Sequence, residues 1–118
     1  MHPKYKLNAE LGWKVHDHLV KLGLETPMTD QVKEDSEKKI AAITDSFSDI
    51  MIELGLDITD DSLCDTPSRV AKMYVNEIFY GLDYNKFPKC TAIENKMSHN
   101  GSFVLEKNIN VQSNCEHH

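Results

Sequence analysis

The sequence predicts an α+β protein in which three amphipathic helices are followed by a β-strand. Apolar residues recur every three or four positions over about residues 8–22, 36–54 and 66–80, which is the spacing that gives a helix one apolar face. Residues 102–111 instead alternate loosely between apolar and polar side chains, which is typical of a half-buried strand. No internal repeat or low-complexity run divides the 118 residues, so we expect one domain.

The first predicted helix begins after Asn8, a suitable N-cap, and ends before Gly23, which suits the left-handed position after a last turn. His16 and His18 both lie within this helix. Two positions along a helix turn side chains about 200° apart, so these histidines cannot hold one metal ion together. We interpret both as solvated surface residues.

The second predicted helix follows a connector, residues 25–35, which shows neither helical nor strand periodicity and contains Pro27. The helix spans about residues 36–54 and contains the most regular apolar stripe of the chain, so its Met and Phe side chains are predicted to be core residues. A connector from Gly55 to Asp65 follows. It is much longer than the roughly 3–4-residue turn of a helix-turn-helix DNA-binding unit, which disfavours that class of protein.

The third predicted helix spans about residues 66–80, with Thr66 as its N-cap and Pro67 in its first turn, where a missing N–H is not needed. Arg69 and Lys72 share one face of its opening turns. Two cations near a helix N-terminus are unfavourable unless an anion is close, so this face is a candidate phosphate site. A solvated basic face is the alternative that spacing leaves open.

The charge balance and the lack of long apolar runs narrow the class of protein. With 13 Lys and Arg against 19 Asp and Glu, the net charge is -6, which disfavours nucleic acid as a partner. No stretch approaches the roughly 20 apolar residues needed to cross a bilayer, and the first residues contain no apolar block typical of a signal peptide. We therefore expect a cytoplasmic protein with no membrane partner.

The three cysteines, Cys64, Cys90 and Cys115, are widely spaced and odd in number, which does not indicate a disulfide framework. We expect reduced thiols. Cys64 and Cys90 are predicted to be small buried side chains. Cys115 differs from them because of the residues that follow it.

The run Cys115–His118 (CEHH) places a thiol and an imidazole three residues apart, directly after the predicted strand. Such a pair can close on one Zn²⁺, but two ligands leave a tetrahedral site half built. Three other interpretations remain open on spacing alone. They are the remainder of an affinity tag, an accidental pairing among the 6 histidines, and an incidental surface cluster.

Several ordered motifs closely resemble GTP cyclohydrolase I of the bacterial type. They are the DDSL and TPSR runs with the helix after them (60–74), EIFYGLDY (77–84), FPK (87–89), IENKM (93–97) and CEHH (115–118). The resemblance implies a zinc enzyme of the tunnelling fold, or T-fold. Within one incomplete domain, residues 1–81 would form a helical part and residues 82–118 the start of the catalytic antiparallel sheet.

The resemblance also implies an activity. Enzymes of this family open the imidazole ring of GTP, release formate and rearrange the ribose to give 7,8-dihydroneopterin triphosphate, the first step toward tetrahydrofolate. Cys115 and His118 match two of the family's zinc ligands, and His117 matches a histidine that protonates the purine ring. Arg69 and Lys72 match positions that contact the substrate triphosphate, which favours the phosphate interpretation of their helix face.

Family chains continue past this histidine pair, so the resemblance implies that the sequence is an N-terminal piece. The third zinc ligand, a cysteine, and the glutamate that recognises guanine are expected beyond it, and the piece itself is expected to be inactive. Glu116 is expected to orient a neighbouring side chain by hydrogen bonding. Family members assemble as homodecamers, and the alternative function is a non-catalytic helical assembly module of the enzyme.

Overall fold

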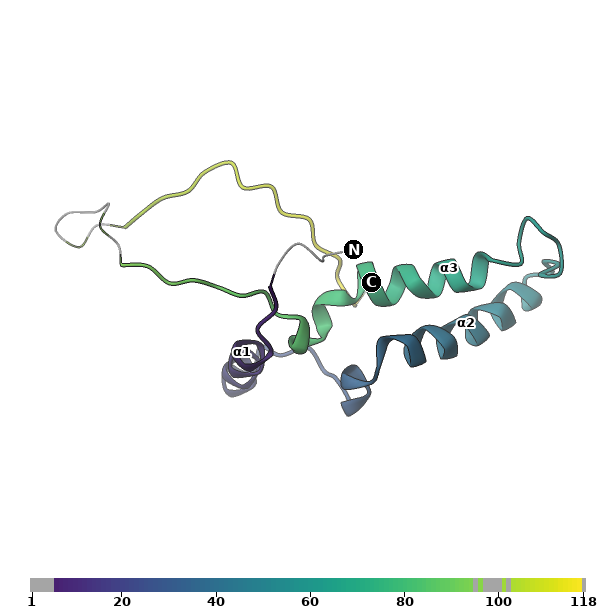
Figure 1. Cartoon of the computed structure of the whole chain (residues 1–118), viewed down its shortest axis with the longest axis horizontal. Helices are drawn as coiled ribbons and strands as arrows, with labels where there is room; N and C mark the ends of the chain where they lie inside the picture. The colour runs from purple at the N-terminus through teal and green to yellow at the C-terminus, as the bar shows by residue number, and fades with distance from the viewer. Residues whose placement is uncertain (1–5, 95, 97–100, 102, 118) are drawn as a thin grey trace.

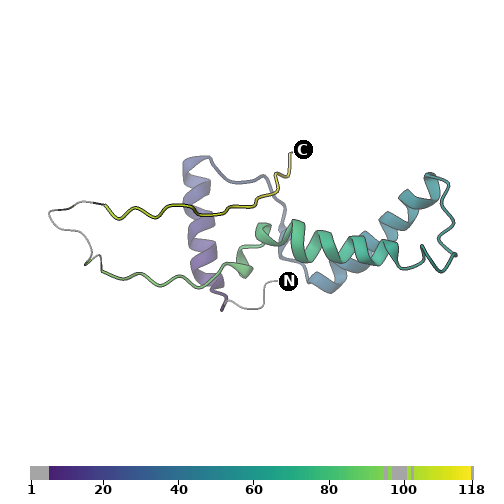
Figure 2. The same cartoon turned by 90° about the horizontal axis from the view of Figure 1, so that it is seen from above.

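The computed structural model describes residues 6–94, 96, 101 and 103–117. This part of the chain contains three α-helices, α1 (Ala9–Leu22), α2 (Ser36–Glu53) and α3 (Thr66–Met73). α2 and α3 form an antiparallel hairpin, and α1 lies roughly perpendicular to it (Figures 1 and 2). The helices predicted from hydrophobic periodicity are therefore confirmed. None of the helices in these ranges is long and apolar enough to cross a membrane.

Local caps fix the ends of α1 and the start of α2. Asn8 Oδ1 accepts a hydrogen bond from the amide three residues further on at 3.0 Å, and α1 ends at Gly23, whose φ of 69° is left-handed. Both agree with the predicted caps. The Asp35 carboxylate accepts hydrogen bonds from the amides of Glu37 and Lys38 at 3.1 and 3.3 Å. It thereby satisfies two of the amides that the first turn of α2 leaves free.

The seam between α2 and α3 is the core of the described structure. Ile40 on α2 packs with Ala71 and Val75, and all three side chains are at most 8% exposed. Ile43, about one turn further along α2, packs against the same cluster. Ala71 is completely buried, and its small side chain allows the two helices to approach closely.

The start of α3 differs from the prediction by one residue. The sequence predicts Thr66 as the N-cap, but Asp65 occupies that position and Thr66 is the first helical residue. The Asp65 side chain makes no capping hydrogen bond, and its Oδ2 lies 4.0 Å from Arg69 Nη2. The carboxylate therefore faces a cation of the first turn instead of capping an amide. Pro67 is buried in that turn, as its missing N–H allows.

The helical path changes register after α3. A π turn, η2 (Tyr74–Ile78), is closed by the Phe79 amide, which donates to the Tyr74 carbonyl at 2.9 Å. Two 3₁₀ turns follow, η3 (Tyr80–Leu82) and η4 (Tyr84–Lys86). The spacing predicts helical structure to about residue 80, and this extent is confirmed, but the wide turn is not predicted. Within it, the rings of Tyr74 and Phe79 lie 5.7 Å apart.

The strand predicted at residues 102–111 does not form in the part of that segment that the structure describes, 103–111, which is extended and unpaired. The outgoing limb (88–94) and the returning limb (103–114) run apart in both views (Figures 1 and 2). A strand is stable only when another strand pairs with its backbone. Among the described residues, antiparallel pairing is confined to an isolated bridge between Leu7 and Pro88. The T-fold sheet is therefore not seen in them.

The chain is elongated because of these limbs. Its extents are 67 × 31 × 27 Å and its radius of gyration is 19.5 Å, whereas a compact domain of this length has a radius of about 13–14 Å. Apolar side chains on the limbs lie in water, and Ile93, Phe103 and Val111 are each more than 80% exposed. Burial of apolar surface in the described residues is therefore concentrated in the helical part.

Gly12 allows α1 to lie directly against η4. A Cβ at this position would overlap the Tyr84 carbonyl oxygen and lie 2.6 Å from Phe87 Cβ. Beside this contact, Trp13 Nε1 donates a hydrogen bond to Asn85 Oδ1 at 2.7 Å. The absence of a side chain at Gly12 thus brings the α1 and η4 backbones together, and Trp13 anchors the contact.

His16 belongs to the same contact, so the prediction that it is solvated is wrong. Its ring lies edge-on to those of Trp13 and Tyr84, at 5.1 and 5.2 Å, and its side chain is 22% exposed. Helical spacing could not predict this, because Tyr84 lies far along the chain from α1. His18 is exposed, as predicted.

Cys64 and Cys90 are exposed, so the prediction that they are buried is wrong. Cys64 lies in the loop between α2 and α3, and Cys90 lies on the outgoing limb. Neither segment faces the α2–α3 seam, so a small apolar side chain has nothing to pack against. Cys115 is exposed too, and all three cysteines are free thiols.

We expect Gly12→Ala to weaken the docking of α1. Overpacking of this kind costs about 1–3 kcal/mol, and alanine offsets about 1 kcal/mol of it as the better helix former. Chemical unfolding followed by the fluorescence of Trp13, the single tryptophan, measures the change. Gly81→Ala is the matched control, because a Cβ there meets nothing within 4 Å. A Gly12→Ala protein as stable as the wild type would contradict the close approach.

The loop between α2 and α3 contains two turns that predict a pH dependence. The Thr59 hydroxyl and amide donate to Asp57 Oδ1 at 2.6 and 2.9 Å, and Ser62 donates in the same way to Asp60 at 2.6 and 2.8 Å. These hydrogen bonds hold the pKa of both carboxyls below the ordinary value of 3.8. Their contribution to stability is complete above that value and is lost as the pH falls through the lower folded-state pKa.

An NMR titration of the carboxyl carbons tests this. Thr59→Val removes the hydroxyl donor, so we expect the pKa of Asp57 to rise toward 3.8. Asp60, in the same sample, keeps both donors and serves as the internal control. An unchanged Asp57 midpoint would show that the hydroxyl does not stabilise its charge.

Candidate functional site

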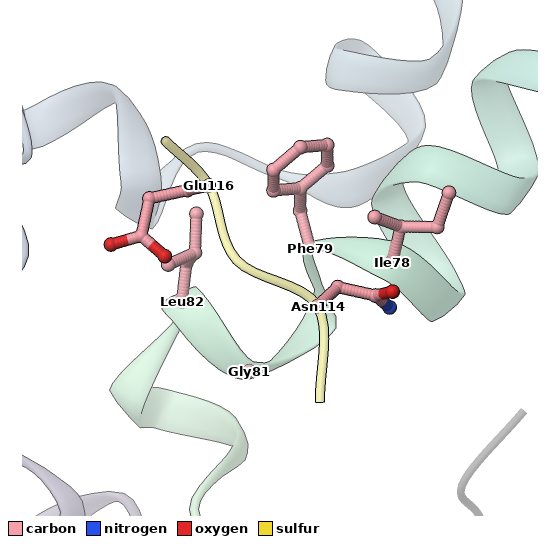
Figure 3. Close-up of a pocket in the computed structure, with 6 residues that line it drawn as sticks. All are labelled: Ile78, Phe79, Gly81, Leu82, Asn114 and Glu116. Carbon is pink, nitrogen blue, oxygen red and sulfur yellow. The ribbon is translucent and has the colours of Figure 1, made fainter. Parts of the chain in front are cut away.

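Residues 114–117 lie against the turns that follow α3. Figure 3 shows the side chains of Asn114 and Glu116 on opposite sides of this segment, which passes over η2 and η3. A cavity of about 220 Å³ lies between this segment and the two turns. Its lining residues are Ile78, Phe79, Gly81, Leu82, Asn114 and Glu116. η2 and η3 therefore supply an apolar wall, and the C-terminal segment supplies the polar groups.

Three possible metal donors meet on the C-terminal segment. One donor atom each from Cys115, Glu116 and His117 lies within 4.8 Å of the others, and all three residues are exposed. Cys115 Sγ lies 3.5 Å from His117 Nδ1, and Glu116 Oε1 lies 3.8 Å from the same nitrogen. His118, predicted as a zinc ligand, lies outside the described residues. The predicted Cys115 and His117 are thus brought together, with Glu116 beside them.

Glu116 is held from a distant part of the chain. Thr26 Oγ1, on the connector between α1 and the 3₁₀ turn η1 (Asp30–Lys33), donates a hydrogen bond to Glu116 Oε1 at 3.1 Å. A hydrogen bond from its own backbone amide holds the pKa of Glu116 below its ordinary range, and the Thr26 hydroxyl and the charge of His117 act in the same direction. The carboxylate is therefore stabilised in its charged form.

This donor set suits Zn²⁺. Zinc binds thiolate sulfur, imidazole nitrogen and carboxylate oxygen, usually in a tetrahedral arrangement. The exposed Cys115 and His117 can turn toward an ion without leaving a packed core. A carboxylate beside ligating side chains commonly orients them, which fits Glu116.

Arg69 and Lys72 are both exposed on α3, in agreement with a basic face. In the described part of the chain, no hydrogen bond or ion pair joins either of them to the CEHH segment. Arg69 precedes Ile78, on the cavity wall, by nine residues (78 − 69). This separation corresponds to about 14 Å along a helix axis. The structure therefore does not bring the two basic residues into the donor cluster.

Sequence reasoning missed two parts of this site. Thr26 gave no signal, because a lone threonine in a connector has no recognisable partner at a separation of 90 residues. The cavity wall at Ile78 and Phe79 was also missed, since both residues read as continued helix. Aromatic and apolar residues just before Gly81 were the available signal, but they do not indicate a π turn.

A helical hairpin whose following turns lie against a cluster of thiol, carboxylate and imidazole groups defines a protein segment with a possible metal site. Comparison with known families gives the particular family. The family model for GTP cyclohydrolase I matches residues 43–118, well over half of the chain. The chain belongs to the GTP cyclohydrolase I family.

Curated relatives agree with this assignment. GTP cyclohydrolase 1 of Klebsiella pneumoniae subsp. pneumoniae is 53% identical over 105 residues, which cover 88% of this chain and 47% of the relative. The proteins of the same name from Enterobacter sp. and Salmonella arizonae are each 51% identical over the same shares. The chain therefore spans about half the length of the relatives it matches.

Proposed function

We propose that this chain is part of a GTP cyclohydrolase I, which uses water to open the imidazole ring of GTP and gives formate and 7,8-dihydroneopterin triphosphate. The observation that carries the proposal is the match of residues 43–118 to the GTP cyclohydrolase I family, and the exposed Cys115 and His117 beside the turns after α3 support it. The product would enter tetrahydrofolate synthesis.

Zinc is the proposed cofactor, with Cys115 and His118 as two of its ligands. Two ligands do not complete a tetrahedron, so a third protein ligand must come from elsewhere in the protein and leave one position for water. Bound zinc lowers the pKa of such a water toward 7 and so supplies hydroxide at neutral pH. Glu116 orients its neighbours and is not a ligand in this proposal.

His117 is the proposed proton donor to the purine ring. It neighbours both proposed ligands in sequence, and its ring is exposed, so a bound substrate can reach it. An imidazole exchanges protons near neutral pH, which suits ring opening under cellular conditions. Its Nδ1 already faces Cys115 and Glu116, so Nε2 is the nitrogen left to meet substrate.

Arg69 and Lys72 are proposed to bind the triphosphate. Both present fixed positive charge in water on one face of α3, and a guanidinium and an ammonium are suitable partners for phosphate oxygens. GTP is elongated, with its purine and its γ-phosphate at opposite ends. The basic face on α3 and the donor cluster are separate. A substrate of this shape can lie between them.

The assembled form is also a proposal. Exposed apolar side chains on the returning limb, such as Phe103 and Val111, and its unpaired backbone suit incorporation into a T-fold sheet. We also propose a homodecamer, as the family resemblance implies, and a cytoplasmic location, as the sequence predicts. The alternative function, a helical assembly module without catalysis, would keep oligomerisation and lack turnover.

Formate release from GTP by the zinc-loaded full-length enzyme tests the proposal, since this chain spans about half the length of its relatives and is itself proposed to be inactive. We expect Cys115→Ser to lower both zinc content and turnover, by more than the roughly 10–100-fold loss seen when a residue that only supports a ligand is removed. Cys64→Ser is the control, because Cys64 is equally exposed and lies in the distant α2–α3 loop. Removal of zinc with a chelator should abolish turnover, and added Zn²⁺ should restore it. Formate release without Cys115 would rule out its proposed role.

The basic face generates a separate prediction. Arg69→Met and Lys72→Met should each raise the KM for GTP roughly 10- to 100-fold, because a hydrogen bond to a charged group contributes about 1.5–3 kcal/mol. Inhibition by inorganic triphosphate should weaken in parallel. Lys21→Met, which removes an exposed cation from the last turn of α1, is the control. An unchanged KM in both variants would show that this face is only solvated.

A further inference from the structure

The hydrogen bond from Thr26 to Glu116 joins parts of the chain that are 90 residues apart. Thr26 is half-buried on the connector between α1 and η1. The Glu116 side chain is 31% exposed, against 66% for the adjacent His117. Glu116 is therefore drawn toward the connector, while its neighbour remains in water.

One carboxylate oxygen makes both contacts. Glu116 Oε1 accepts from the Thr26 hydroxyl at 3.1 Å and lies 3.8 Å from His117 Nδ1. Cys115 Sγ lies 3.5 Å from the same nitrogen. Both contacts fall on one nitrogen, so one edge of the His117 ring faces the carboxylate and the sulfur atom. Nε2 is then left free on the other side of the imidazole.

We infer that Thr26 is a positioning residue that holds Glu116 Oε1 beside His117 Nδ1 and so fixes the orientation of the His117 ring. The inference rests on the proposed function for the role of His117 in proton transfer. Thr26 itself touches no reacting atom.

A positioned carboxylate is needed because the segment is otherwise unsupported. A glutamate side chain samples many rotamers when it is exposed, and the Thr26 hydroxyl is the partner from the helical part that holds Glu116. Loss of the hydroxyl would release Glu116 Oε1 from its place and let the ring of His117 reorient. The order of the ring thus depends on a connector that lies outside the family motifs.

The ring of His117 gives a direct readout that does not involve activity. We would measure its ¹⁵N chemical shifts in the metal-free protein at pH 9, where a free imidazole is neutral. The wild type should show ring shifts that differ from those of a free histidine. Thr26→Val, which keeps the shape and removes the hydroxyl, should move the ring shifts toward those of a free histidine, and Thr26→Ser should restore the wild-type spectrum.

Thr29→Val is the matched control on the same connector. The Thr29 hydroxyl accepts from the Gln31 amide and makes no hydrogen bond with Glu116 in the described part of the chain, so its removal should leave the His117 shifts unchanged. Glu116→Gln should reproduce the effect of Thr26→Val. The double variant should show no further change, because both substitutions break one chain of contacts.

Turnover of GTP by the zinc-loaded full-length enzyme supplies the second readout. Thr26→Val should lower kcat about tenfold, the lower end of the range for residues that orient active-site groups. Its KM for GTP and its zinc content should match those of the wild type, and Thr26→Ser should recover kcat.

The two proposals fail in different ways. A full-length wild-type enzyme that releases no formate from GTP would overturn the proposed function, and the ring spectra would still decide the role of Thr26. Identical His117 spectra for wild type and Thr26→Val, or a failure of Thr26→Ser to restore the wild-type spectrum, would overturn the positioning role.

Discussion

The approach of α1 to η4 at Gly12 is the constraint on which the rest of the described structure depends. It places the N-terminal helix against a turn that follows α3, and two cations then tie this turn and α1 to neighbouring segments. Lys86 Nζ, on η4, donates to Ser36 Oγ at the start of α2 at 3.1 Å. Lys33, on η1, lies 4.6 Å from the centre of the Trp13 ring. α1, η4 and the start of α2 therefore form one unit, although each comes from a different part of the chain.

This unit determines the course of the connector after α1, and the connector determines the site. The connector must run from the end of α1 back to Asp35, and on this path Thr26 meets Glu116. No member of the donor cluster is buried. Water therefore screens its charges, and the cluster is ordered by hydrogen bonds rather than by burial. A metal ion bound by such exposed donors would add the cohesion that the cluster itself lacks.

Features that arise within a few residues were predictable from the sequence. Asn8 and Gly23 mark the ends of α1, and the apolar stripe gives α2, because caps and periodicity are local properties. Contacts between distant segments were not predictable. His16 reads as solvated until Tyr84 is beside it, and the alternating pattern of residues 103–111 indicates a strand without indicating its partner. The donor residues were recognisable as a motif, whereas Thr26 becomes relevant only once the chain is folded.

The π turn explains how one helical path serves two surfaces. Lys72 and Phe79 are seven residues apart and would share a face if the α-helix continued. The i to i+5 hydrogen bond at Tyr74 adds a residue to the turn, so the side chains after it are displaced around the axis. Phe79 consequently lines the cavity under the CEHH segment, while Lys72 stays in water on the basic face. An apolar wall and a cationic face can therefore follow one another along the same path without competing for one side of it.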